Sequence, residues 1–164
     1  MKRSSASKMM FAMFAGVALM ASAADSQLTV PVAFGRGLDT AQPGNAVNHA
    51  VLPDKIRVAE GGVVHFLVSG LHQIFVYHQG TEVGDIAVPV SDPFINDERN
   101  LKYKGINPAG GPLGTAATAN PSNAVNRLES ITFDQPGTYL VICNVRQHFQ
   151  DGMHAVVNVV PRSP

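Results

Sequence analysis

The sequence predicts an all-β sandwich or barrel that forms one domain. Short apolar or alternating runs recur along the chain, and glycine-containing turns separate them. This spacing is typical of consecutive strands in a sandwich or barrel. No convincing amphipathic helix and no internal repeat interrupts the pattern. The 164 residues are enough for one domain with a substantial core.

The N-terminus has the three parts of a secretory signal peptide. Basic residues open it, an apolar run from Met9 to Met20 follows, and Ala21-Ser22-Ala23 supplies the small residues of a cleavage site. The apolar run is too short to span a bilayer. We therefore expect residues 1–24 to be a removed signal peptide and residues 25–164 to be a soluble domain in the periplasm.

The first half of this domain contains several strand-like runs. Pro31 lies in the first of them and cannot donate to a β-ladder, so we expect an edge strand there. Glycine-containing turns follow the second and third runs. The predicted strands are Leu28–Phe34, Lys55–Ala59, Val63–Val68, Gln73–Tyr77 and Gly84–Val88.

The strand pattern stops between Pro89 and Arg127. This segment is first charged and mixed, with a helical turn expected around Ile95 to Leu101, and then rich in Gly, Ala, Pro, Asn and Thr. A loop this long usually carries a function or is partly mobile. We expect an irregular flap across the sandwich over about residues 89–127. Strand patterns resume with Leu128–Phe133, Gly137–Ile142 and Ala155–Val160.

The loop between the last two predicted strands carries three side chains that bind soft metals. Cys143, the only cysteine, is followed by His148 and Met153, each after four intervening residues. Blue-copper sites use one thiolate, two imidazoles and a weak axial thioether. Zinc prefers closed tetrahedral sets, which rarely include Met. The alternative is a structural cysteine beside an unrelated histidine and methionine, and the spacing together with the flanking strands disfavours it.

A blue-copper site needs a second imidazole from elsewhere in the chain. His72 is the candidate, because it follows a glycine turn and begins a predicted strand. His65 lies mid-strand, where a side chain is usually packed or solvent-facing. His78 ends a strand and His49 sits in an early loop, so either could be a surface residue. His154 would point away from the loop if its strand has begun.

These segments together resemble the cupredoxins, the family of small blue-copper proteins. Ile56–Phe66 followed by His72 is similar to the first half of the family pattern. Pro136–Cys143, with His148 and Met153 behind it, is similar to the second half. The spacing of the loop is similar to that of rusticyanin. The resemblance implies a Greek-key sandwich in which one type 1 copper ion is bound by His72, Cys143, His148 and Met153.

Two neighbours of the expected ligands depart from the family pattern. Gln73 stands where cupredoxins often have Asn, and Asn144 stands where they often have Ser or Thr. In the family, these neighbours connect the two ligand segments by hydrogen bonds. Gln and Asn can still do so, and the bonds they form would affect the copper potential.

The resemblance implies one-electron transfer between redox partner proteins such as cytochromes or oxidoreductases. We expect a monomer that has no stable membrane insertion after signal removal. Nucleic acid is not expected as a partner, because the 12 basic and 12 acidic side chains form no basic cluster. His148 would be the ligand through which electrons enter and leave the copper site. Phe149 would help to cover it, and Arg146 and Gln147 would flank it.

Two other functions compete with electron transfer. Copper oxidases and nitrite reductases with cupredoxin domains need histidines beside the cysteine, whereas Cys143 is flanked by Ile142 and Asn144. We therefore expect no enzyme activity. A copper carrier with the same ligands is the main alternative. The chain has a single methionine beyond the predicted signal, Met153, which argues against a methionine-rich shuttle.

Overall fold

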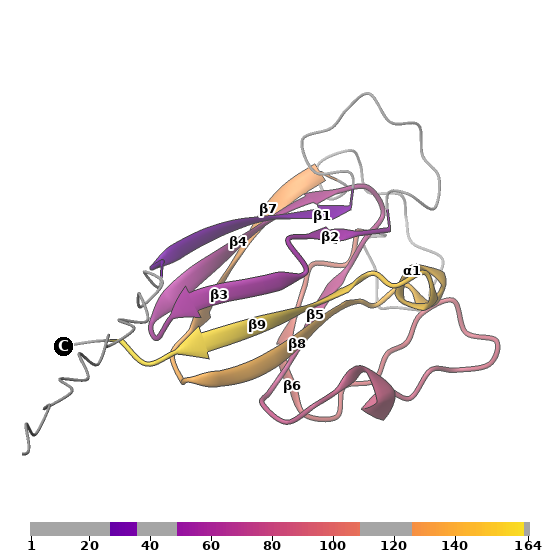
Figure 1. The fold of residues 1–164 in the computed structure, drawn as a ribbon. Helices are drawn as coiled ribbons and strands as arrows, with labels where there is room; N and C mark the ends of the chain where they lie inside the picture. Colours follow the sequence, from indigo (N-terminus) through magenta and orange to yellow (C-terminus); the bar gives the residue numbers. More distant parts are fainter. Residues whose placement is uncertain (1–26, 36–48, 109–125, 163–164) are drawn as a thin grey trace, which may run out of the picture.

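The computed structural model describes residues 27–35, 49–108 and 126–162 (Figure 1). The predicted signal peptide and residues 109–125 of the predicted flap lie outside these described residues. Strands are the predominant regular structure of the described chain, and they form two sheets. The predicted all-β sandwich is therefore confirmed.

The first sheet has four strands in the order β2-β1-β4-β7. β1 runs parallel to β4, and β4 runs antiparallel to β7. The bounds are β1 Thr29–Gly35, β2 Val51–Leu52, β4 Gly62–Ser69 and β7 Asn126–Phe133.

The second sheet has five strands in the order β3-β9-β8-β5-β6. β8 is antiparallel to both of its neighbours, and β3 is parallel to β9. The bounds are β3 Lys55–Ala59, β5 Ile74–Tyr77, β6 Leu101–Lys104, β8 Gly137–Cys143 and β9 His154–Val160.

The two sheets bury different patterns of side chains. β4 alternates strictly between buried and half-buried residues, as expected for a strand with one face on the core. All four residues of β5 are buried. Its inner side chains, Ile74 and Val76, join the central core, whereas Phe75 and Tyr77 pack in a second cluster with Ile86 and others. Because both faces of β5 are covered, its sequence is a continuous apolar run.

The segment between β5 and β7 differs from its prediction. Gly84–Val88 is not a strand, since a 3-10 helix, η2 (Val83–Asp85), stands at its start. β6 lies inside the segment predicted to be irregular. The helical turn predicted around Ile95 to Leu101 is absent, and β6 begins at Leu101. β6 is only four residues long, Leu-Lys-Tyr-Lys, and among the described strands it pairs only with β5. A short polar edge strand of this kind gives little sequence signal.

The prediction for Pro31 is only partly right. β1 lies inside its sheet, because β2 pairs with it at Ala33 and Phe34. Pro31 falls in the half of β1 that pairs with β4 alone. Proline has no backbone N–H to donate, and no described strand lies beside Pro31 on the side away from β4, so no ladder hydrogen bond is lost there. β1 as a whole is nevertheless not an edge strand.

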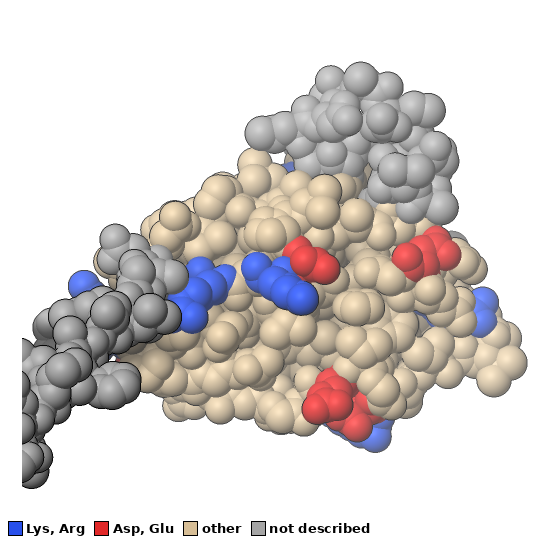
Figure 2. Space-filling view, viewed as in Figure 1, with Lys and Arg blue, Asp and Glu red and all other residues tan. Residues whose placement is uncertain are grey.

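One end of the sandwich carries the loop between β8 and β9, with the short helix α1 (Arg146–Gln150), away from the end where β9 finishes (Figure 1). Charged side chains are scattered over the face seen in Figure 2, and neither sign gathers into a patch there. In the described ranges, no helix combines the length and apolar character needed to cross a membrane.

Candidate metal centre

Three of the four predicted ligands meet at the end of the sandwich that carries α1. The Cys143 sulfur lies 3.7 Å from Nδ1 of His72 and 3.6 Å from Nδ1 of His148. The two Nδ1 atoms are 2.9 Å apart. A metal ion held about 2.0 Å from each nitrogen and about 2.3 Å from the sulfur would separate its donors by about 3 to 4 Å. The triangle therefore has the size that one such ion requires.

Two backbone hydrogen bonds hold the ligand loop, one between its two ends and one within it. The N–H of Cys143 donates to the carbonyl of Met153 at 3.0 Å, and the N–H of Met153 donates to the carbonyl of His148 at 2.9 Å. Met153 is fully buried and belongs to the same core cluster as Cys143. The loop thus holds the last predicted ligand beside the cysteine, inside the protein.

Two glycines make room for the imidazole of His72. A Cβ on Gly35 would lie 2.6 Å from Nε2 of His72 and 2.3 Å from the carbonyl oxygen of Ser69, and a Cβ on Gly70 would lie 3.0 Å from the same nitrogen. Both glycines have positive φ, +94° and +109°, which other residues rarely adopt. The backbone of β1 and of the turn before His72 can therefore approach the ring closely.

Gln73 and Asn144 connect the two ligand segments, as expected of those positions. The Asn144 side chain donates to Oε1 of Gln73 at 2.9 Å, and its backbone N–H donates to the Gln73 carbonyl at 2.8 Å. Gln73 donates in turn to the carbonyl of Gly105 at 2.8 Å. Both side chains are almost fully buried. This network fixes His72 relative to Cys143 through residues next to each of them.

A buried ion pair also supports His72, and the sequence did not single it out. The Arg127 side chain is 7 % exposed and that of Glu129 is 1 % exposed. Arg127 donates to Oε1 of Glu129 at 2.6 Å and to the carbonyl of His72 at 2.9 Å. Tyr103 donates to the other Glu129 oxygen at 2.9 Å. Arg127 and Glu129 are two residues apart on β7. Their contacts with His72 and Tyr103 reach the other sheet, which no local motif indicates.

His49, considered above only as a surface residue, lies directly against the site. Its ring stacks on that of His148 with a centroid distance of 3.7 Å and an interplanar angle of 24°. Its Nδ1 lies 2.5 Å from a carboxylate oxygen of Asp151. Nothing in the sequence around His49 marks it as part of the site, because the contact spans 102 positions of the chain.

The surroundings of the donors set their protonation. Burial, followed by the nearby His148, lowers the pKa of His72 to about 3, and burial lowers that of His148 to about 4. Burial also raises the pKa of the Cys143 thiol to about 12. Both imidazoles are therefore neutral near pH 7, as metal ligands must be. A metal has to displace the proton of the thiol when it binds.

The residues expected around His148 take different positions. Phe149 is 8 % exposed and packs in the second cluster, with Ile86 and others. Arg146 donates to the carbonyls of Pro89 and Val90. Gln147 is exposed and donates to Asp151 at 2.9 Å. Among these neighbours, Phe149 and Arg146 anchor the ligand loop to the segment after η2.

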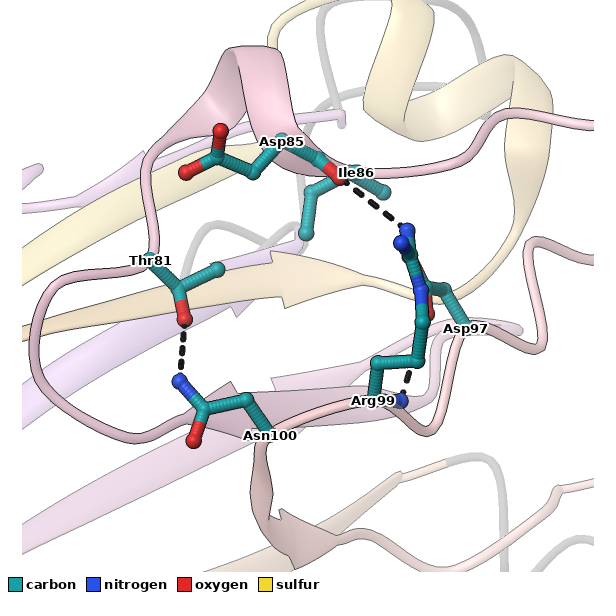
Figure 3. A pocket seen from close by; sticks show the side chains of 6 residues that line it. All are labelled: Thr81, Asp85, Ile86, Asp97, Arg99 and Asn100. Atoms are coloured by element: carbon teal, nitrogen blue, oxygen red, sulfur yellow. Dashed lines mark hydrogen bonds and ion pairs between the residues drawn. The ribbon is translucent and has the colours of Figure 1, made fainter.

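A separate pocket of about 160 Å³ is lined by residues that lie between β5 and β6 (Figure 3). Asn100 donates to Thr81 at 2.7 Å, and Arg99 donates to the carbonyl of Asp85 and to the carboxylate of Asp97. The hydrogen bond from Arg99 is the largest cause that lowers the pKa of Asp97, to about 2. These groups bond to one another, so the pocket wall holds the segment in place.

Comparisons with known proteins found similarity at the level of structure. No protein-family model and no curated protein matches the sequence. Auracyanin from Roseiflexus castenholzii is 22% identical over 83% of this chain and 99% of its own, with a TM-score of 0.49. Plastocyanin from Dryopteris crassirhizoma is 20% identical over 80% of this chain and 100% of its own, with a TM-score of 0.40.

Rusticyanin is 18% identical over 80% of this chain and 78% of its own, with a TM-score of 0.42. These three proteins are cupredoxins, the family whose pattern the sequence resembles. At such identities and TM-scores, what the site can bind is decided by its own donors.

Proposed function

We propose that this protein is a periplasmic electron carrier that binds one type 1 copper ion through His72, Cys143, His148 and Met153. The observation that supports this proposal most is the triangle of two neutral imidazoles and one buried sulfur. Thiolate and imidazole ligands in a trigonal arrangement, with a weak thioether nearby, suit copper in electron-transfer sites. A closed tetrahedral zinc site would replace the thioether with a stronger ligand.

The bound copper would supply reversible one-electron chemistry, and the protein's part is to hold the ligands still. Cys143 ends β8 in the centre of a sheet, and His72 is held by the glycines, the amide network and the Arg127–Glu129 pair. Ligands fixed in this way change little between oxidation states. Electron transfer between the copper and a partner protein would then have a small reorganisation energy.

Electron transfer fits the residues better than catalysis. The neighbours of Cys143 are Ile142 and Asn144, so the histidine bridge that a second copper site would need is missing. The main alternative is a copper carrier with the same ligands. His72 and Cys143 are only 3% and 0% exposed, which favours retention of the metal over its release to a partner.

The remaining parts of the proposal concern location and partners. Residues 1–24 would direct export and be removed, and residues 25–164 would act as a monomer in the periplasm. Redox proteins such as cytochromes or oxidoreductases would exchange electrons with the copper. The basic, apolar and small-residue regions of the N-terminus support export.

The deciding experiment is a visible and EPR spectrum of the copper-loaded mature protein. We expect intense sulfur-to-copper charge transfer, a small parallel hyperfine splitting and reversible reduction. The variant Cys143→Ala should lose the visible band completely, because the sulfur that produces it is gone. A colourless protein that binds only Cu(I) would instead favour the carrier. A visible band that survives in Cys143→Ala would end the case for a copper–thiolate bond.

The axial role of Met153 is tested by Met153→Gln. An amide oxygen is a harder ligand than a thioether and favours Cu(II), so the reduction potential should fall while copper is retained. Protein-film voltammetry on both proteins measures the change. An unchanged potential would remove Met153 from the coordination sphere.

A further inference from the structure

Within the described chain, His49 is the residue outside the ligand set whose ring lies most closely against a predicted ligand. Its ring and that of His148 stack at 3.7 Å. Toward His72, by contrast, the centroid distance of His49 is 6.1 Å and the rings are nearly perpendicular. The close parallel contact is therefore specific to His148.

The backbone places His49 independently of the site. β2 pairs with the end of β1, and the N–H of Gly35 donates to the carbonyl of Ala50 at 2.9 Å. His49 directly precedes this bonded residue. Its position is thus determined by the first sheet, whereas His148 belongs to α1, between two strands of the second sheet.

A second contact fixes the plane of the His49 ring. Nδ1 of His49 lies 2.5 Å from one oxygen of Asp151, and the other oxygen of Asp151 accepts a hydrogen bond from Gln147 at 2.9 Å. The His49 side chain is 18% exposed and that of Asp151 is 25% exposed. The ring is therefore held at one edge by the ligand loop while its face lies against His148.

We propose that His49 is a positioning residue that clamps the imidazole of His148 from outside, so that His148 cannot swing away from Cys143. The clamp connects the first sheet to the ligand loop of the second. It extends the proposed function, since it concerns the same metal centre. It acts on His148 both with and without metal, so it can be tested even if the copper chemistry differs.

The test compares His49→Ala with His49→Phe and with the control His65→Ala. Phe keeps an aromatic face for the stack, whereas Ala removes it. His65 is also a half-buried histidine with one side-chain hydrogen bond, to Ser130 at 2.7 Å, but it lies in the middle of β4. Circular dichroism would first establish that each variant is folded.

Two measurements test whether His49 restrains the His148 ring. The first is NMR relaxation of the His148 ring in the apoprotein, where loss of the stack should increase ring motion in His49→Ala only. The second is the rate at which EDTA removes Cu(II) from the loaded protein. Aromatic pairs contribute modestly, so removal should be a few-fold to about tenfold faster in His49→Ala. It should stay within about twofold of wild type in His49→Phe.

The outcomes separate the clamp from the proposed function. If wild type lacks the blue spectrum but His49→Ala loosens the His148 ring, the clamp stands and the copper proposal fails. If the spectrum is present and His49→Ala matches wild type in both measurements, the clamp is wrong. It is also wrong if His49→Phe is as loose as His49→Ala, or if His65→Ala loosens the site equally.

Discussion

The two imidazoles of the site are held in different ways. His72 is 3% exposed, and its neighbours are buried backbone, the amides of Gln73 and Asn144, and the Arg127–Glu129 pair. His148 is half-buried on a helix of five residues, and a partly exposed ring covers it. The inner imidazole therefore belongs to the core, whereas the outer one depends on contacts between side chains at the surface.

This difference predicts that substitutions near one imidazole will mainly affect the stability of the fold, and substitutions near the other will mainly affect metal retention. Changes around His72 disturb buried hydrogen bonds and charges, so they should lower the free energy of unfolding of the whole domain. Changes around His148 remove contacts that are partly in water, so they should alter the metal centre with little cost to folding. Three substitutions or conditions test the inner half of this comparison.

The largest effect is expected from Arg127→Met. It leaves the carboxylate of Glu129 buried without its cation and removes the donor to the His72 carbonyl. Breaking a buried ion pair on one side typically costs about 3 to 5 kcal/mol. Urea unfolding of the apoprotein measures the loss.

The matched control for that variant is Lys104→Met. Lys104 and Glu98 form an ion pair whose side chains are 46% and 56% exposed, and exposed pairs contribute about 0 to 1 kcal/mol. If both variants lose the same free energy of unfolding, the Arg127–Glu129 pair behaves like an exposed ion pair, and the contrast between the two imidazoles is wrong.

An intermediate effect is expected from Gly35→Ala. The new Cβ would meet the His72 ring and the Ser69 carbonyl, at 2.6 and 2.3 Å. Overpacking usually costs about 1 to 3 kcal/mol, and the positive φ adds about 1 to 2 kcal/mol. Thermal unfolding and the position of the visible band measure the two consequences.

Gly80→Ala isolates the contact with His72. Gly80 has a similar φ of +83°, but nothing lies within 4 Å of its hypothetical Cβ. This control should show only the backbone cost and an unchanged spectrum. A spectrum that is also unchanged in Gly35→Ala would mean that His72 can move without affecting the metal.

The smallest effect is the contribution of His72 to the pH dependence of the apoprotein. The unfolded chain binds a proton at His72 below about pH 6.5, whereas the folded protein does so only below a pKa of about 3. The unfolded state therefore binds more protons in between, and stability falls as the pH drops. The loss from pH 7 to pH 5 should be about 2 kcal/mol for His72. His148, whose pKa is lowered to about 4, adds a loss of its own, so the share of His72 is the difference between wild type and His72→Gln.

Urea unfolding of the apoprotein at both pH values checks this loss, and His72→Gln should reduce it. A free energy of unfolding that stays constant between pH 7 and pH 5 would contradict the burial of a neutral imidazole. It would then place His72 in water and remove the distinction between the inner and outer halves.

The sequence predicted the parts of the site that depend on local spacing. Cys143 and His148 are five positions apart between two strands, so their meeting could be expected from the loop alone. His49, Arg127 and Glu129 could not be found in this way. Their places depend on which strands pair and in which register, and that information is distributed over the whole fold.

The strands divide in the same way into those that the sequence predicts and those that it does not. Strands with clear alternation or continuous apolar residues, such as β4 and β5, were predicted nearly to the residue. β6 was missed because a four-residue edge strand contains mostly polar side chains. Gly84–Val88 resembles a strand in composition, but among the described residues it has no strand partner.

His72 and Cys143 are 71 positions apart in the sequence, and this separation has a consequence for biogenesis. A chain that is synthesised from its N-terminus presents the first imidazole before the sulfur and the second imidazole have left the ribosome. A partial chain can therefore offer no thiolate to trap a stray ion next to His72. The complete set of predicted donors therefore exists only after both segments have been made.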